Sequence, residues 1–235
     1  MKEESRWEQA QGYEKNWWQN RASSIDFEFY KSFADELINF TKNDFTITSE
    51  TKILEIGSGA GGIITFLKTS NHRFAIDPLE EFYSSQKQFT EQRDSSVIYK
   101  NEKGESLSFS DNYFDLLIMD NVLDHCENPK LVFEEAKRVL KKGGFIYFKQ
   151  NTYHIWGKLI RSIMEFFVID KGHPFTFLKS DLQKLVNESN FIVLSKHNNG
   201  YFKTWKKEFS SNFAKDKIKA LLFVTRDKVT CLLKK

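Results

Sequence analysis

Apolar residues along the chain fall into short runs separated by segments of helical length. Five short runs are typical of strands: residues 52–56, 73–77, 96–100, 114–120 and 145–149. The fourth is apolar nearly throughout, as in a strand that is buried on both faces of a sheet. Between the five runs, apolar residues recur at helical spacing or the segment is polar and helix-like, as over residues 80–92. This alternation predicts an α/β fold in which a parallel sheet carries helices on both faces.

The clearest predicted helix starts at Pro129, because a proline suits the first helical position. Its apolar residues recur on one face. Lys141 and Lys142 are expected in its last turn, and Gly143 with Gly144 is expected to end it.

The two ends of the chain depart from this rhythm. Residues 5–42 are expected to be helical, residues 153–190 to hold two more helices, and the last strands to cover 191–196 and 219–228. One domain over residues 1–235 is predicted, in four parts: a helical cap (1–50), a core (51–150), a helical lid (151–190) and C-terminal strands (191–235).

The composition restricts the size of the core, the role of the cysteines and the location to be expected. With 235 residues, 40% of them hydrophobic, the chain can bury the core of one α/β domain. Cys126 and Cys231 lie far apart without C-x-x-C spacing, which argues against a disulfide framework or a structural zinc site. No run of about 18 uncharged apolar residues and no signal-peptide pattern is present, so a cytoplasmic protein is expected.

Charge is distributed unevenly. The net charge is only +3, but residues 191–235 contain eleven Lys or Arg and three Asp or Glu. Such a basic tail suits an anionic partner, or it is a solvated lysine-rich face.

The stretch ILEIGSGAGG, residues 53–62, carries the main chemical signal. Gly57, Gly59 and Gly62 match the dinucleotide pattern G-x-G-x-x-G, with Asp77 about 20 residues on, where a carboxylate binds ribose hydroxyls. Gly57, Gly59 and Gly61 equally match G-x-G-x-G, so the glycines leave the ligand open.

Glu55 restricts the ligand further. A pyrophosphate at a helix N-terminus favours positive potential, so a carboxylate two residues before the first glycine opposes it. A ligand that carries an ammonium and a sulfonium would instead be attracted. The segment therefore favours S-adenosylmethionine over a nicotinamide dinucleotide.

Four motifs in order then resemble the class I S-adenosylmethionine-dependent methyltransferases, in particular the branch of the ubiquinone-biosynthesis O-methyltransferases. They are ILEIGSGAGG, AIDP, GESLSFSDNYFDLLIMDNVLDHCENP and EEAKRVLKKGGFIYF, and the resemblance covers roughly residues 52–191. It implies a Rossmann-like, seven-stranded, mostly parallel sheet whose last strand is antiparallel, and S-adenosylmethionine as cofactor.

The resemblance also implies a set of cofactor contacts. Glu55 would lie near the methionine ammonium, Asp77 would bind the ribose, and the glycines would let the backbone approach. The implied cofactor-binding residues are Glu55, Gly57, Gly59, Gly61, Asp77, Pro78, Gly104, Glu105, Asp120 and Asn121. Lys103 and Ser108, near the expected adenine contacts, depart from the Asp and Pro that are common in the family.

A hydroxyl or amine acceptor would use a general base. His125 is the first candidate, with Asp124 beside it, and His154 and His173 follow because they fall in the expected lid. Each histidine also has a structural alternative. Methyl transfer from a sulfonium depends mainly on alignment, and no metal is predicted.

The acceptor is left open. Residues 153–169 form apolar helical rows, including Phe167, and residues 201–209 mix aromatics with lysines, which suits packing, a hydrophobic acceptor or a membrane surface. Trp7, Tyr13, Trp17 and Trp18 could close over the site. A small-molecule acceptor, hydrophobic, lipid-linked or a sugar, is favoured over nucleic acid. The alternatives are an RNA methyltransferase that uses the basic tail, an inactive binding protein and a dehydrogenase.

Overall fold

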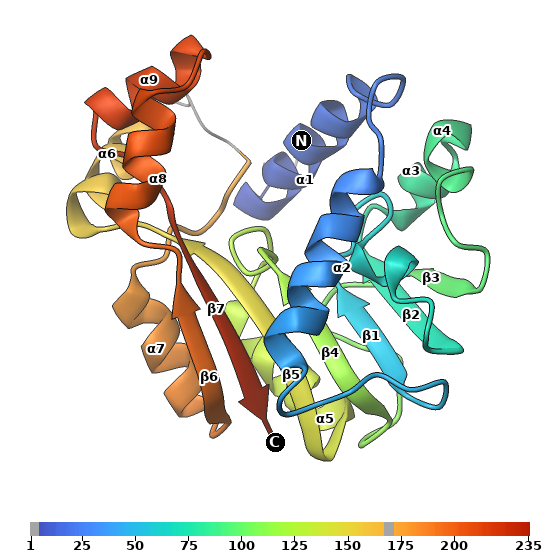
Figure 1. Ribbon diagram of the computed structural model, residues 1–235. Helices are drawn as coiled ribbons and strands as arrows, with labels where there is room; N and C mark the ends of the chain where they lie inside the picture. The colour runs from blue at the N-terminus through green and yellow to red at the C-terminus, as the bar shows by residue number, and fades with distance from the viewer. Residues whose placement is uncertain (1–4, 167–171) are drawn as a thin grey trace.

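A computed structural model describes residues 5–166 and 172–235 of the protein (Figure 1). Its strands are β1 Lys52–Ile56, β2 His72–Asp77, β3 Val97–Asn101, β4 Phe114–Asp120, β5 Leu140–Thr152, β6 Ile192–Asn198 and β7 Asp227–Lys234. Its helices are α1 Arg6–Gln19, α2 Glu28–Thr41, the short 3₁₀ helix η1 Ile63–Phe66, α3 Glu80–Ser84, α4 Lys87–Thr90, α5 Pro129–Val139, α6 Ile155–Phe166, α7 Lys179–Glu188, α8 Tyr201–Phe209 and α9 Ala214–Leu221.

All seven strands belong to one sheet, in the order β3-β2-β1-β4-β5-β7-β6. Strands β1 to β5 pair in parallel, and β7 runs antiparallel between β5 and β6. The chain order reverses between β1 and β4, and their carboxyl ends are where an open α/β sheet binds its ligand. The predicted fold class is confirmed.

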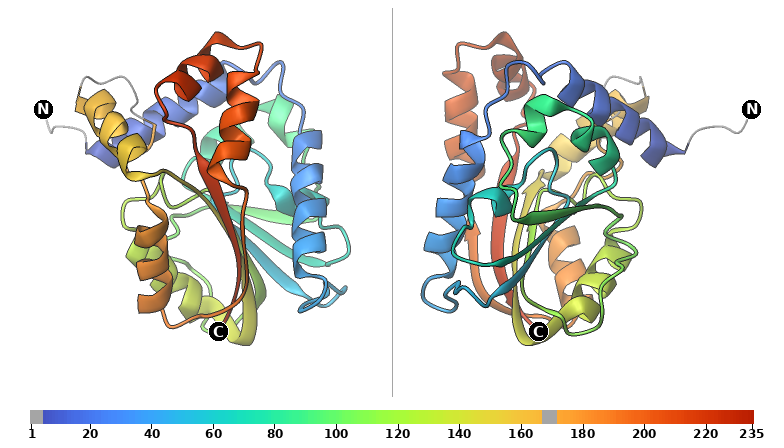
Figure 2. Two further views of the ribbon diagram at one scale, coloured as in Figure 1. Left: turned by 60° about the vertical axis from the view of Figure 1, so that its left-hand side comes forward. Right: turned by 90° about the vertical axis from the view of Figure 1, so that its right-hand side faces the viewer.

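Two apolar clusters cover the two faces of the sheet. On one face α5 and α7 contribute Val132, Phe133, Leu182 and Val186 to the core. On the other face α2, η1, α3 and α4 supply a second cluster that includes Leu37. The left view of Figure 2 shows α7 and α2 on opposite sides of the sheet. Helix α1 instead crosses above the carboxyl ends of the strands (Figure 1).

Two helix predictions need correction. Helix α5 ends at Val139, before Lys141 and Gly143, because the carbonyls of Arg138 and Val139 accept N–H groups from the loop before β4 at 3.0 and 2.7 Å. The segment 80–92 is two short helices rather than one. Tyr83 and Phe89 are both buried in the same cluster, whereas six residues of continuous helix would turn them about 120° apart.

The strand predicted over residues 219–228 is wrong. Residues up to Leu221 belong to α9, and β7 starts at Asp227. In the apolar run that suggested a strand, Leu221, Leu222 and Phe223 are exposed, whereas Leu232 and Leu233 of β7 are fully buried. The part expected to hold C-terminal strands therefore also holds α8 and α9. Helix α7, placed in the expected lid, packs against the sheet instead. The division into a single domain stays a prediction.

Candidate active site

A cavity of about 320 Å³ lies at the carboxyl ends of β1 and β4. Most sequence-predicted cofactor residues meet in its wall: Glu55, Gly57, Gly59, Asp77, Pro78, Gly104, Glu105, Asp120 and Asn121. They come from four separate segments. A pocket of this size with a few convergent polar groups is typical of a small-molecule site.

The first turn after β1 requires glycine for conformational and steric reasons. Gly57 and Gly59 have φ values of 73° and 57°, which other residues rarely adopt. A Cβ at Gly59 would lie 3.2 Å from the ring of Trp18 and from the Tyr30 hydroxyl. At Gly57 and Gly59 the turn can therefore present its backbone to the cavity only because these residues lack a side chain.

Gly61 does not line the cavity, in contrast to the prediction. A Cβ there would lie 2.5 Å from the ring of Phe27, so this glycine makes room for packing behind the loop. Gly62 has a φ of 77°, and a Cβ at this position would clash with the Glu55 carboxylate. The third glycine of either pattern thus serves packing rather than ligand approach.

Glu55 has a local task that the sequence did not indicate. Its Oε1 accepts the Ile63 N–H at 3.1 Å and its Oε2 accepts the Ile64 N–H at 2.8 Å, so it caps η1. Burial raises the pKa of this carboxyl to about 8, although the two N–H donors oppose the shift. Glu55 also lines the cavity, so contact with a ligand ammonium stays a prediction.

Asp77 ends β2 and holds the loop and the next helix together. Its Oδ2 accepts the Gly59 N–H and its Oδ1 accepts the Leu79 N–H, both at 2.9 Å. Burial, followed by the nearby charge of Glu14, raises the pKa of Asp77 to about 7. Both oxygens keep a second lone pair, which hydroxyl donors of a ligand can use.

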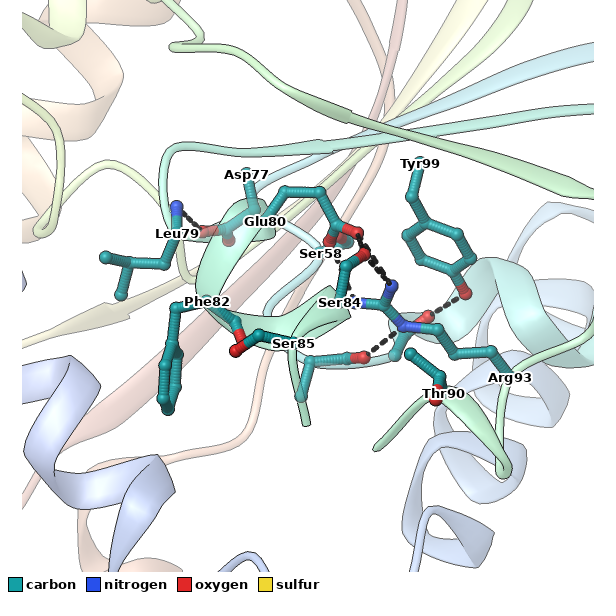
Figure 3. Close-up of polar contacts among 12 residues, drawn as sticks. Ser58, Asp77, Leu79, Glu80, Phe82, Ser84, Ser85, Thr90, Arg93 and Tyr99 are labelled. Carbon is teal, nitrogen blue, oxygen red and sulfur yellow. Dashed lines mark hydrogen bonds and ion pairs between the residues drawn. The ribbon is translucent and has the colours of Figure 1, made fainter. Parts of the chain in front are cut away.

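An ion pair supports the glycine loop from behind (Figure 3). The Arg93 guanidinium contacts both oxygens of Glu80 at 2.7 and 2.8 Å, and its Nε donates to the Ala60 carbonyl at 2.6 Å. The guanidinium lies 3.9 Å from the Tyr99 ring centroid, and the Tyr99 hydroxyl donates to the Gly61 carbonyl at 2.7 Å. These contacts fix the loop backbone relative to β3 and α3.

Charged groups gather where β4 and β5 end. Lys149, almost fully buried, places its Nζ 2.8 Å from Oε2 of Glu36 and 3.4 Å from Oδ2 of Asp120. Burial raises the pKa of Asp120, and the lysine opposes that shift. Lys228 of β7 lines the cavity, and its pKa is lowered by burial and then by Lys149.

Asn121 follows β4 with a φ of 56°, unusual for a residue other than glycine. Its Oδ1 accepts the Asn151 N–H at 3.1 Å and the Gln150 Nε2 group at 3.2 Å. The strained residue is therefore held by β5 and lines the cavity, as sites that position a ligand often are.

Helix α1 supplies one wall of the cavity, and the sequence analysis had identified only the tryptophans of this wall. Trp7, Gln11, Glu14 and Trp18 all line the cavity. Their spacing is that of one helix face, a signal that could have revealed the two polar residues. Tyr13, also expected to close over the site, is exposed and is not in the wall.

Gln11 is informative because its side chain is buried and its Oε1 has no hydrogen-bond partner among the described residues. Such an acceptor is satisfied by a ligand or by water. The cavity thus offers acceptors for the hydroxyl, amino and ammonium donors of S-adenosylmethionine. Further wall residues that the sequence analysis missed are Tyr30, Phe33, Val122, Val132, Asn151 and Lys228.

His125 reaches the cavity, whereas Asp124 is not in its wall. The His125 Nδ1 lies 3.5 Å from Oε2 of Glu14, and its ring centroid is 4.6 Å from that of His173. The buried Asp124 accepts the Gln150 Nε2 group at 2.7 Å, and its Oδ2 lies 3.9 Å from Nε2 of His173.

Asp124, His125 and His173 offer ligand atoms that all lie within 4.8 Å of one another, a set that suits a transition metal. The predicted absence of a metal therefore remains untested. His154 lies elsewhere, with its Nε2 2.8 Å from the Phe223 carbonyl oxygen, so it does not serve this cavity.

Comparison with known proteins agrees with this geometry. Residues 54–148 match the model of the methyltransferase domain family. An uncharacterized protein of Methanocaldococcus jannaschii is 43% identical over 93 residues, 40% of this chain and 41% of that protein. A highly reducing polyketide synthase of Penicillium polonicum is 32% identical over 110 residues, 43% of this chain and 4% of the synthase. The chain thus spans less than half the length of either relative.

Solved structures show the same fold. A Bacillus halodurans protein assigned to the methyltransferases superposes with a TM-score of 0.64 at 19% identity, over 87% of this chain and 99% of that one. Phosphoethanolamine N-methyltransferase 2 of Haemonchus contortus, in complex with S-adenosylmethionine, gives 0.65 at 16%, over 86% and 52%. Residues 54–148 are thus similar to a methyltransferase domain, and the chain has the class I fold of these methyltransferase structures.

Proposed function

We propose that the protein binds S-adenosylmethionine in the cavity and transfers its methyl group to a small-molecule acceptor. The observation that carries the proposal is the convergence of residues from four separate segments of the chain on one cavity at the reversal point of the sheet. The carboxylates of the cavity and the free Gln11 acceptor match the hydrogen-bond donors of this cofactor. Because a pyrophosphate favours positive potential, the same carboxylates argue against a pyrophosphate ligand.

In this proposal the residues of the chain bind and align the cofactor. Asp77 accepts the ribose hydroxyls while its backbone contacts keep the glycine turn in shape. Asp120 and Asn121, which line the cavity, are proposed to contact the methionine part of the cofactor. The bound cofactor supplies a methyl group that its sulfonium already activates, so alignment of the acceptor is the main task left to the protein.

His125 is the proposed general base because it is the histidine in the cavity wall among the described residues. Glu14, 3.5 Å from its Nδ1, orients the ring. Asp124 acts as a positioning residue for the same loop, since it touches Gln150 and approaches His173 rather than the cavity.

The acceptor proposed is hydrophobic, lipid-linked or a sugar. Two alternatives remain: an RNA methyltransferase that uses the basic tail, and a binding protein without activity. A cytoplasmic location is also part of the proposal. Among the described residues, no helix has the length and apolar character needed to cross a membrane.

Titration calorimetry tests the cofactor assignment. S-adenosylmethionine, S-adenosylhomocysteine and NAD are titrated into the wild type and the Asp77→Ala variant. We expect both adenosyl ligands to bind, NAD not to bind, and the variant to bind at least ~10-fold more weakly. A folded wild type that binds neither adenosyl ligand would contradict the proposal.

Release of S-adenosylhomocysteine then tests the acceptor class, with lipophilic phenols, glycans and RNA compared side by side. Turnover with RNA alone, weakening steeply as salt rises, would favour the RNA alternative. Cofactor binding without turnover on any acceptor would favour the inactive protein.

A further inference from the structure

The amphipathic helix α6 has its apolar side exposed. Ile155, Trp156, Leu159 and Ile163 lie on one helical face and are 45–78% exposed. The opposite face carries Arg161, which is only 8% exposed. A surface helix of a water-soluble domain normally has the reverse arrangement. Phe167, expected on this apolar row, lies outside the described residues.

Helix α9 repeats this inversion. Ile218, Leu221 and Leu222 share one face and are 47–65% exposed, while Ala220 points inward and is buried. At 100° per residue, Lys215 and Lys217 fall on the two edges of the exposed apolar face.

Helix α8 and the turn after it extend the same surface. Phe202 of α8 is 77% exposed and Phe213, just before α9, is 73% exposed. Lys206 lies beside Phe202 and Phe209 on the outer face of α8, at 100° per residue. No side chain of this nine-residue helix is buried.

These helices form one continuous corner of the molecule. The Trp156 indole donates to the Leu222 carbonyl at 3.1 Å, which joins α6 to the end of α9. The Trp205 indole donates to the Ala220 carbonyl at 2.9 Å, which joins α8 to α9. Figures 1 and 2 show α6, α8 and α9 together at the end of the sheet where the parallel strands finish. We name the exposed apolar residues of α6, α8, α9 and their turns the apolar corner: Ile155, Trp156, Leu159, Ile163, Phe202, Phe209, Phe213, Ile218, Leu221, Leu222 and Phe223.

The charged residues beside the apolar corner indicate which kind of partner surface can bind there. Residues 201–221 contain six lysines and only two acidic residues, Glu208 and Asp216. Asp216 is paired with Lys219, and Glu208 accepts the Thr225 hydroxyl at 2.6 Å. A second copy of the chain would bring the same lysines face to face, which is repulsive. A water-exposed apolar face bordered by lysines fits an anionic lipid surface, where the rings insert among the acyl chains and the ammonium groups meet the headgroups.

We propose that the apolar corner docks the protein on the surface of an anionic membrane, with α6, α8 and α9 lying in the interface. The corner shares no residue with the cavity. Docking and cofactor binding therefore fail separately, so the two proposals can be tested independently.

Vesicle co-sedimentation of the full chain tests the docking. Vesicles of phosphatidylcholine alone are compared with vesicles in which one third of the lipid is phosphatidylglycerol. We expect the wild type to sediment with the anionic vesicles, and high salt or neutral vesicles to lower the bound fraction. Replacing Phe202 and Phe213 by Ser should reduce the partition coefficient about tenfold or more, since both rings insert.

Two controls match these changes. Leu131→Ser removes an exposed apolar residue of α5, outside the corner, and should leave binding unchanged. Lys206→Glu should weaken binding to the anionic vesicles, whereas Lys130→Glu on α5 should not. Thermal melting and S-adenosylhomocysteine binding of the Phe202→Ser, Phe213→Ser variant establish that it is folded.

Three outcomes would overturn the proposal. The wild type could stay in the supernatant with anionic vesicles, or Leu131→Ser could weaken binding as much as the corner variant does. Alternatively, sedimentation velocity could show a dimer that the corner variant converts to a monomer, without vesicle binding, which would make the corner a contact between copies of the chain.

Discussion

The Glu55 carboxylate offers the sharpest test of the site geometry. Each oxygen accepts one backbone N–H at the start of η1, from Ile63 and from Ile64. The Glu55→Gln variant has a single amide oxygen, so one of these buried N–H groups would face an NH₂ donor. A buried N–H group without an acceptor costs about 1–3 kcal/mol.

This cost sets the expected change in melting temperature. In a domain of this size each 1 kcal/mol lowers the melting temperature by about 2–4 °C, so Glu55→Gln should melt roughly 2–12 °C lower at pH 7. The variant also removes a buried charge. Because burial raises the pKa of Glu55 to about 8, that carboxyl is mostly protonated at pH 7, and relief from charge burial becomes important only above pH 8.

Thermal melting at pH 7 measures the cost, with Glu81→Gln on the exposed side of α3 as the matched control. Calorimetry then separates the two roles of the carboxylate. S-adenosylhomocysteine has the amino-acid ammonium, and 5′-methylthioadenosine lacks it. The capping role predicts that Glu55→Gln weakens both ligands by a similar factor. An unchanged melting temperature together with weakening of S-adenosylhomocysteine alone would refute the capping argument and support direct ammonium contact.

Three further predictions concern the surroundings of the cavity. Arg93→Ala leaves the buried Glu80 carboxylate without its partner, so unfolding in urea should show a loss of about 3–5 kcal/mol, and a loss below ~1 kcal/mol would contradict the ion pair. Gly61→Ala should lower the stability by about 1–3 kcal/mol and should also weaken S-adenosylhomocysteine binding, because the loop must move to make room for the methyl group. Gly143→Ala, whose added methyl meets no neighbour, should lower the stability alone. Equal affinity losses of the two variants in calorimetry would contradict this reasoning. Because the folded pKa of Asp77 is raised to about 7, its contribution to stability is present below about pH 4 and is lost as the pH rises through 7. Asp77→Asn should flatten that part of the curve of melting temperature against pH, and an unchanged slope would exclude the raised pKa.

The central strands could be predicted from the sequence because strands buried on both faces must be apolar nearly throughout. The prediction for β4 matches its bounds, Phe114–Asp120, in full. It failed for residues 219–228, where Leu221, Leu222 and Phe223 are as apolar as a strand but lie exposed on the apolar corner. Apolarity alone does not distinguish burial in a core from exposure on a docking surface.

The candidate site likewise contains residues that could be predicted from the sequence and residues that could not. Asp77 and Asp120 could be predicted because each ends a strand of the parallel sheet, at the edge where such sheets bind ligands. Gln11 and Lys228 could not, since they lie far from the motifs in sequence and reach the cavity only through packing of α1 and β7.

The sequence by itself determined the α/β order, the glycine turn after β1 and the acidic strand ends, because these depend on local conformation and on the periodicity of buried residues. The tertiary structure decided what those residues do. It turned both oxygens of Glu55 to backbone N–H groups, placed Phe27 against Gly61, and left the apolar side of α6 exposed. Each of these outcomes depends on contacts between residues distant in the chain or on what covers a face, and a linear pattern does not contain that information.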